Sequence, residues 1–495
     1  MKVKKQYFSR WLHVVAGLVV LSAITISVWI FRRNYYSGNT IAFTNVNLIP
    51  MTSETVVENQ TVLVRGSEIV AIGDSDSVKI PAGAQVIDGK GAYLMPGLAD
   101  MHAHTRISTQ QWAQPWEDTK IWPVHPLKLY LANGVTTIRD LNALEEPGTY
   151  PRQLQADIHA GRRVGPTIYT SGESLYASPL GDPEGRVRQN HEREYDLLKV
   201  FPYLTVDDFQ AAMREAKKLG IYTTGHIPYA VGLEGVRAAG MDEIAHVNQL
   251  DWEIIEPDRN RQLSPQEWEP YLIQAALQKI DLSADDPLGS FLMGNASTLE
   301  HIAGELKTAG VSVCTTMVFG EVLYLKLFQP EVFLARLENK FLDPKYLAIL
   351  RRGEEWDQIQ CRAMKGLCAI EYDFDRWILR GLHEAGVQLL LGTDAIGGIG
   401  IVPGFSIHDE LRILVENGLT PYEALLTGTV NAANVVERMT GEGNFGTIEN
   451  GKRADLILVR GNPLEDITTI REPLGVMASG KWFSGEELSQ LLETR

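Results

Sequence analysis

Cysteine is scarce in this chain. Only three cysteines, Cys314, Cys361 and Cys368, occur among the 495 residues, and none is part of a CxxC motif. This argues against a zinc finger or a thioredoxin-like redox site. Cys361 and Cys368 could form a disulfide in a protein that works outside the cytoplasm, and two free thiols are the alternative. The sequence also lacks low-complexity segments and short solenoid-type repeats, so we expect an ordinary globular chain with a large core.

Positive charge is scarce as well. The formal net charge is −16, from 46 basic and 62 acidic side chains, and six of the basic ones lie in the first 33 residues, which contain no acid. Removing these six leaves 40 basic side chains against 62 acidic ones, a net charge of −22 for the remainder. Nucleic-acid phosphates require clustered Lys and Arg, so we expect no nucleic-acid partner. We attribute the excess of acidic residues to the solubility that a high net charge gives a protein.

The amino terminus predicts a membrane anchor within residues 1–36. The basic stretch Met1–Arg10 is followed by twenty mostly apolar, uncharged residues, Leu12–Phe31, and then by Arg32 and Arg33. At about 1.5 Å per residue this helix reaches roughly 30 Å, enough to cross a bilayer. More basic residues precede the span than follow it, which predicts a cytoplasmic amino terminus and a periplasmic or extracellular body. A cleaved signal peptide, giving a secreted protein, is the alternative.

The two ends of the remaining chain are rich in short strands. Residues 40–95 and 442–485 alternate apolar and polar side chains and are divided by turn signals such as Asp88-Gly89. Because both ends share this character, we expect them to meet in one small composite domain, a β-sandwich.

The long middle, residues 96–441, alternates strands and helices. The expected strands cover 97–104, 134–141, 165–172, 195–201, 220–227, 242–247, 310–318 and 386–394. Repeated strand–helix units imply parallel strands, and eight of them imply an α/β fold of the closed (β/α)₈ TIM-like type. The segment from about residue 250 to 305 is longer than one strand–helix unit needs, and we expect it to form a helical lid over the barrel mouth. An insertion packed on the side of the barrel is the alternative.

Histidines gather at the predicted strand ends. His102 and His104 lie two residues apart on the first strand, so their side chains point to the same face and can converge on one ion. His226 and His246 end two later strands. Strand ends of a barrel face one mouth, and neutral imidazole is a common ligand of zinc and related ions. The pattern therefore predicts a metal site.

Two further side chains lie at strand ends in the same region. Asp394 ends the last strand; an Asp there could cap a helix, but beside the histidines we expect a metal ligand that also moves protons. Lys199 ends the fourth strand and points away from its apolar neighbours. A free ammonium cannot bind a cation, so its chemistry alone predicts a surface residue or a substrate contact.

The chain resembles the amidohydrolase superfamily, near the branch of imidazolonepropionase-like proteins, prolidases and metal-dependent carboxypeptidases. The resemblance covers about residues 40–485 and is weakest in 250–305. The motifs that carry it are LMPGLADMHAH, NGVTTIRDL, YDLLKVF, AKKLGIYTTGHIP, AAGMDEIAH, LLLGTDA, SIHDELRILVENGLTPYEALLTGTVNAA and GTIENGKRADLILVRGNPL.

The resemblance implies a site with two divalent metal ions, with zinc the expected metal. His102, His104 and Asp394 would hold the more buried ion, and His226 and His246 would hold the other. It also implies that Lys199 is carboxylated on its amine. The resulting carbamate would bridge the two ions, which removes the chemical objection to lysine as a ligand.

The chain differs from the family in the segments that are expected to contact the substrate. SGESLYASPLGDPEG replaces the usual glycine- and histidine-containing segment after the third strand, and Phe201 occupies a position where relatives often have tyrosine. The hydroxyl of Tyr203 or Tyr229 could polarise a substrate carbonyl instead. His408, which is expected to begin the helix after the last strand, could also contact substrate, but a capping or structural role is preferred.

The implied activity is metal-dependent hydrolysis of a carbon–nitrogen bond in a small substrate. A dipeptide or acyl-amino acid is the preferred class, and a cyclic amide or lactone on the same metal core is the alternative. Deamination would favour a single ion without the carboxylated lysine. A non-catalytic barrel acting as an interaction module would be expected to lack ligands, and all six positions are filled. A homo-oligomer is compatible with the sequence.

Overall fold

The computed structural model describes residues 40–493, apart from 110–111, 116–123, 142–148, 343, 345–346, 349–364 and 396–399. The predicted membrane span, Leu12–Phe31, lies outside these residues, as does Cys361 of the predicted disulfide. Within the described ranges, none of the helices combines the length and the apolar character needed to cross a bilayer.

The described middle of the chain contains eight parallel strands in a ring. They are β6 (Leu98–Ala103), β9 (Val135–Asp140), β10 (Thr167–Thr170), β12 (Leu198–Tyr203), β13 (Thr223–Gly225), β14 (Glu243–Ile244), β15 (Ser312–Cys314) and β16 (Leu389–Leu390). β6, β9 and β10 pair in one sheet, and β12 to β16 pair in sequence order in another. Parallel bridges from Ser171 to Leu197 and from Ala103 to Ala395 join the two sheets on both sides. The predicted TIM-like barrel is confirmed.

The barrel strands are short and mostly buried. Every residue of β6 and of β9 is buried, as expected for parallel strands that are covered on both faces. β14 has only two residues, Glu243–Ile244, because the chain turns at His246 into the 3₁₀-helix η1 (Val247–Leu250). β11 (Leu175–Ala177) extends the sheet beside the carboxy-terminal half of β12.

Helices surround the barrel and connect its strands. Their bounds are α3 (Pro126–Ala132), α4 (Thr149–His159), α5 (Pro183–Glu192), α6 (Val206–Leu219), α7 (Gly232–Ala239), α11 (Ala296–Ala309), α12 (Met317–Phe328), α13 (Pro330–Leu334), η2 (Leu337–Phe341), α16 (Lys365–Ala385), α17 (Ser406–Glu416), α18 (Pro421–Thr427) and α19 (Val430–Thr440). α6 begins where the Thr205 hydroxyl accepts a hydrogen bond from Asp208 N. It ends at Gly220, whose φ of 69° suits a left-handed cap.

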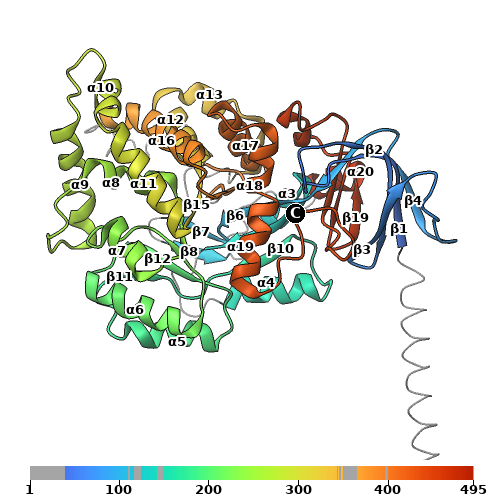
Figure 1. Cartoon of the computed structure of the whole chain (residues 1–495), viewed down its shortest axis with the longest axis horizontal. Coiled ribbons are helices and arrows are strands. Elements are labelled where there is room, and N and C mark those ends of the chain that lie inside the picture. The colour runs from blue at the N-terminus through green and yellow to red at the C-terminus, as the bar shows by residue number, and fades with distance from the viewer. Residues whose placement is uncertain are drawn as a thin grey trace, which may run out of the picture.

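Strands from both ends of the described chain form one sheet. They are β1 (Thr40–Leu48), β2 (Val57–Arg65), β3 (Glu68–Asp74), β4 (Gln85–Asp88), β5 (Tyr93–Pro96), β17 (Leu456–Val459), β18 (Gly475–Ala478) and β19 (Lys481–Ser484). The order β19-β18-β17-β5-β1-β2-β3, with β4 beside β1, is continuous because β5 pairs with β17. A sandwich of two sheets was expected; this continuous pairing makes a single sheet instead. It lies beside the barrel, next to η3 (Ile467–Arg471) and α20 (Gly485–Glu493) (Figure 1).

The long segment between β14 and β15 is helical. It contains α8 (Asp251–Ile255), α9 (Pro265–Lys279) and α10 (Pro287–Gly294) before α11 begins. Trp268 and Leu272 of α9 pack with Tyr229, which follows β13, so this insertion contacts the rim where the strands end. A separate hairpin, β7 (Arg106–Thr109) and β8 (Trp112–Pro115), follows β6.

Candidate metal centre

His102 and His104 project from the end of β6. His102 is 1% exposed, and its Nδ1 lies 3.1 Å from the carbonyl oxygen of Ala245, which leaves Nε2 for the barrel mouth. Arg139 Nε donates to the carbonyl of Met101 at 2.7 Å and so holds the strand just before His102. The two imidazole rings lie 5.2 Å apart. The alternation of the strand therefore places both rings on one side, as expected.

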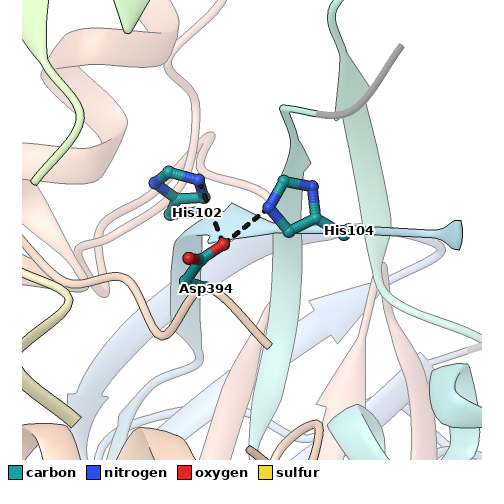
Figure 2. Close-up of side chains that lie close together, drawn as sticks. All are labelled: His102, His104 and Asp394. Atoms are coloured by element: carbon teal, nitrogen blue, oxygen red, sulfur yellow. Dashed lines mark hydrogen bonds and ion pairs between the residues drawn. The ribbon is translucent and has the colours of Figure 1, made fainter. Parts of the chain in front are cut away.

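Asp394 meets both histidines from the neighbouring strand of the ring, because it follows β16, which is bridged to β6 through Ala103 and Ala395. Its Oδ1 lies 2.6 Å from His104 Nε2 and 3.4 Å from His102 Nε2 (Figure 2). The backbone of Asp394 adopts the left-handed region, with φ of 55°, and its N–H donates to the carbonyl of His102 at 2.8 Å. One ligand atom from each of the three residues lies within 4.8 Å of the others. This spacing suits a metal ion coordinated by all three.

His226 and His246 continue the cluster. The His246 ring lies 4.5 Å from the His102 ring and 4.9 Å from the His226 ring, measured between centroids. His246 Nδ1 lies 2.9 Å from Thr316 Oγ1, and His226 Nδ1 lies 3.4 Å from the carbonyl of Val200. Such partners fix the orientation of an imidazole and leave its other nitrogen for a metal.

Lys199 is buried among these ligands. It is 1% exposed, and within the described structure its Nζ has no hydrogen-bond partner. Burial lowers the pKa of the Lys199 amine to about 8, although the nearby Asp394 opposes this shift. At pH 7 roughly a tenth of such an amine is neutral, compared with under ~0.1% for an ordinary lysine. A buried, unpartnered and partly neutral amine fits the carboxylation that the resemblance implies.

The buried histidines have the protonation state that metal ligands need. Burial lowers the pKa of His102, His226 and His246 well below the usual value, and the positive charge of Lys199 lowers it further. All three imidazoles are therefore neutral near pH 7, the form in which imidazole binds metals. The six predicted residues thus come together, and their donor set fits divalent cations.

A polar cavity of about 140 Å³ opens onto the cluster. It is lined by His226, His246, Val247, Asn248, Gln249, Thr315, Thr316, Met317, Phe319, Gly320, Asp375 and Asp394. Three predicted metal ligands thus share a cavity with η1 and with the amino-terminal part of α12.

Comparison with known proteins supports the sequence prediction. Residues 375–483 match the amidohydrolase family. Ochratoxinase of Aspergillus niger is 26% identical over 431 residues, covering 79% of this chain and 76% of that protein. The crystal structure of a Xaa-Pro dipeptidase with methionine in its active site superposes with a TM-score of 0.61 at 20% identity, covering 90% of this chain and all of that one. The resemblance to the amidohydrolase superfamily is confirmed.

A second group of relatives matches a smaller part of this chain. A 5-methylthioadenosine/S-adenosylhomocysteine deaminase of Bacillus cereus (strain G9842) is 28% identical over 214 residues, 39% of this chain and 44% of that protein. Together the family match and these relatives identify an enzyme that acts on carbon–nitrogen bonds. The superfamily generally uses divalent metals, and the His102–His104–Asp394 group is suited to hold one.

Buried polar residues that the sequence analysis did not identify also support the site. Arg139 and Glu243 form a fully buried ion pair, in which Arg139 Nη1 donates to Glu243 Oε2 at 2.8 Å. Asp100 accepts hydrogen bonds from Thr393 Oγ1 at 2.6 Å and from the backbone of His102 at 3.2 Å. Burial raises the pKa of Asp100 to about 7. The available signal was a charged residue inside a predicted barrel strand, as at 139 and 243.

The predicted substrate contacts lie outside the cavity lining. The Tyr203 hydroxyl donates to Glu269 Oε1 at 3.1 Å, and the Tyr203 ring lies 5.8 Å from that of Tyr229. Tyr229 is 8% exposed and packs against Trp268 of the insertion. Both therefore belong to an aromatic cluster at the rim.

His408 lies in a different environment. It is 4% exposed at the start of α17, and burial, together with the charge of Arg471, lowers its pKa to about 3. It interacts with the backbone of Asn133 at the end of α3 and is not among the described residues that line the cavity. This position suits a packing role between helices.

Proposed function

We propose that the chain hydrolyses an amide bond of a small substrate, preferably a dipeptide or acyl-amino acid, with two divalent metal ions, zinc in the first instance. The observation that carries this proposal is the convergence of His102, His104 and Asp394 within 4.8 Å, with the rings of His226 and His246 beside them. A non-catalytic barrel would not need to keep this set of neutral, oriented ligands.

Each residue has a role in this proposal. His102, His104 and Asp394 would hold one ion, and His226 and His246 would hold the other. The ammonium of Lys199 would lose one proton to become a neutral amine and a second on adding carbon dioxide through Nζ, which would give an anionic carbamate able to serve as a metal ligand. Bound divalent ions lower the pKa of water and polarise a carbonyl.

Asp394 is placed to move the proton. Its Oδ1 faces both histidines of β6 and also lines the cavity. Asp394 accepts a proton from the attacking water while the bond from oxygen to the carbonyl carbon forms. It returns this proton to the nitrogen as the carbon–nitrogen bond breaks, which releases an acid and an amine.

A turnover screen on the zinc-loaded full-length protein tests the proposal. Dipeptides, acyl-amino acids, cyclic amides and lactones are offered to the wild type, to Asp394→Asn and to Asp207→Asn, an exposed control on α6. We expect amide hydrolysis that falls about 10²–10⁴-fold in Asp394→Asn and is unchanged in Asp207→Asn. Full activity of Asp394→Asn would overturn the proposed role.

Two alternative activities would use the same barrel. Turnover of a cyclic amide or lactone alone would favour the related hydrolase on the same metal core. The partial similarity to a deaminase favours deamination as a further candidate. Deamination predicts one ion and activity that survives Lys199→Ala, whereas the binuclear amide hydrolase predicts loss of activity in that variant.

We also propose that Leu12–Phe31 anchors the enzyme, with the catalytic body outside the cytoplasm. The apolar run and its flanking basic residues support this topology. In sealed vesicles of known orientation, protease should digest the body only from the extracytoplasmic side. Release of a soluble body after cleavage near residue 36 would favour the signal-peptide alternative.

A further inference from the structure

Two acidic side chains are buried together beside the cavity. Asp251 begins α8, directly after η1, and Asp375 lies in α16; they are 6% and 5% exposed. Their carboxyl groups share a hydrogen bond, which requires one of them to keep a proton. Burial, followed by the neighbouring acids, raises the pKa of both groups well above the usual value. Glu371 lies on the same helix one turn away and contributes further negative charge.

No basic side chain among the described residues pairs with these two groups. Across the described ranges, neither Asp251 nor Asp375 forms an ion pair, and the charges that act on them come from acids. By contrast, the buried Glu243 of the barrel interior is paired with Arg139. Buried carboxylates without a cation are rare in proteins because desolvation strongly disfavours them. The described basic residues therefore do not supply a counter-ion for this pair.

Several acceptor atoms near the cavity also lack donors. Oδ1 of Asp375, Oδ1 of Asp251 and Oδ1 of Asn248 are buried, and no described atom donates a hydrogen bond to any of them. Asp375 and Asn248 line the same cavity as His226, His246 and Asp394. The missing component is thus a group with several hydrogen-bond donors and a positive charge. An ammonium has three N–H donors and a guanidinium has five, and neither accepts hydrogen bonds.

We propose that Asp251 and Asp375, with Asn248, bind a positively charged ammonium or guanidinium group of the substrate in the cavity that also contains the metal ligands. The inference rests on the proposed amide hydrolysis and narrows its substrate class to cationic amides. The cation displaces the proton shared by the two carboxyl groups and becomes the counter-ion of the pair. Its source is either the free α-amino group or a Lys or Arg side chain of the substrate.

Four substrates separate these two sources. They are Ala-Lys and Ala-norleucine, each with a free and with an acetylated amino terminus. Norleucine keeps the length of the lysine side chain but lacks its charge. A preference for lysine over norleucine identifies the side chain as the bound cation, and a preference for the free over the acetylated forms identifies the α-amino group.

The matched variants are Asp375→Asn and Asp373→Asn. Asn imitates the protonated carboxyl in size, so Asp375→Asn should fold, and Asp251→Asn serves as a second test of the pair. Asp373 lies on the same helix but is 62% exposed and pairs with Arg376. We expect Asp375→Asn to raise KM at least tenfold for the preferred cationic substrate, with little change for its neutral counterpart. Asp373→Asn should behave as wild type.

A binding measurement separates this inference from the proposed function. Calorimetric titration with pentylamine and with neutral pentanol requires no turnover. We expect pentylamine to bind the wild type, to lose at least tenfold in affinity in Asp375→Asn, and to release a proton on binding. If this holds while no amide is hydrolysed, the cation site stands and the proposed function fails. If amides are hydrolysed without charge preference and Asp375→Asn matches Asp373→Asn, the function stands and the cation site is refuted.

Discussion

Replacing Glu243 by Gln tests whether the buried ion pair supports the metal centre. Glu243 joins β14 to β9 through Arg139, and it also accepts from Tyr222 Oη at 3.0 Å and from Thr224 Oγ1 at 2.9 Å. Each carboxylate oxygen faces one guanidinium nitrogen of Arg139 and one hydroxyl. In either orientation, the Gln amide nitrogen would therefore meet an N–H donor of Arg139.

The expected loss of stability is large because both partners are fully buried. Side-chain exposure of Arg139 and of Glu243 is 0%, so the variant leaves an uncompensated guanidinium in the barrel interior. Removing one partner of a buried pair costs about 3–5 kcal/mol. For a domain of this size we expect the unfolding temperature to fall by on the order of 10 °C.

Urea and thermal unfolding of the metal-free protein measure the effect without the stabilisation that bound metal adds. Glu234→Gln, on the exposed face of α7, is the matched control and should change the free energy of unfolding by less than about 0.5 kcal/mol. A loss below about 1 kcal/mol for Glu243→Gln would refute the reasoning that this pair holds the strands beneath the site.

Three other changes act closer to the ligands. In Gly225→Ala the new Cβ would lie 2.0 Å from the carbonyl oxygen of Val200, and φ is already 149°, so we expect β13 to shift and metal binding to be lost while circular dichroism is retained. Thr316→Val removes the partner of His246 Nδ1 and should weaken metal affinity about 10–100-fold, measured by chelator competition. Asp100→Asn should gain stability relative to the wild type as pH rises from about 4 to about 7, measured by urea unfolding of the metal-free proteins.

The direction of the effect expected for Asp100→Asn follows from the raised pKa of Asp100. The unfolded chain releases the Asp100 proton near pH 4, while the folded chain keeps it until about pH 7. The wild type therefore loses stability across this range, and the Asn variant does not. An equal difference between the two proteins at pH 5 and pH 8 would contradict this account.

The predictions for Gly225→Ala and Thr316→Val each have a control variant. Gly304→Ala places its Cβ in open space and should keep full metal binding. Thr316→Ser keeps the hydroxyl and should restore the affinity lost in Thr316→Val. Normal metal binding by Gly225→Ala, or unchanged affinity in Thr316→Val, would show that these contacts do not position the histidines.

The sequence was sufficient to predict the barrel, because repeated strand–helix units and strand-end histidines are local patterns. Strand lengths were less predictable: residues 242–247 were expected as a strand, yet only Glu243–Ile244 pair. Turning of the chain at His246 depends on tertiary contacts such as the one to Thr316, which no local pattern encodes. Alternation correctly separated Lys199 from its apolar neighbours, but its chemistry alone predicted a surface residue or a substrate contact. Its near-complete burial depends on closure of the ring.

Contacts between segments that are distant in the sequence could not be predicted from it. Asp251 and Asp375 belong to segments with no shared motif, and they meet only because α16 packs against η1 and α8. The sandwich expected from the two strand-rich ends became one sheet because β5 pairs with β17, a contact set by how the barrel brings the ends together. His408 was expected at the start of the helix after the last strand, but its neighbours Asn133 and Arg471 belong to distant segments that the sequence could not link to it.

The number of metal ions bound per chain tests the central claim most directly. The purified full-length protein is equilibrated with zinc and bicarbonate, freed of excess metal and analysed by mass spectrometry of the elements. The account predicts two ions per chain. A protein that binds no metal under any loading condition would contradict it.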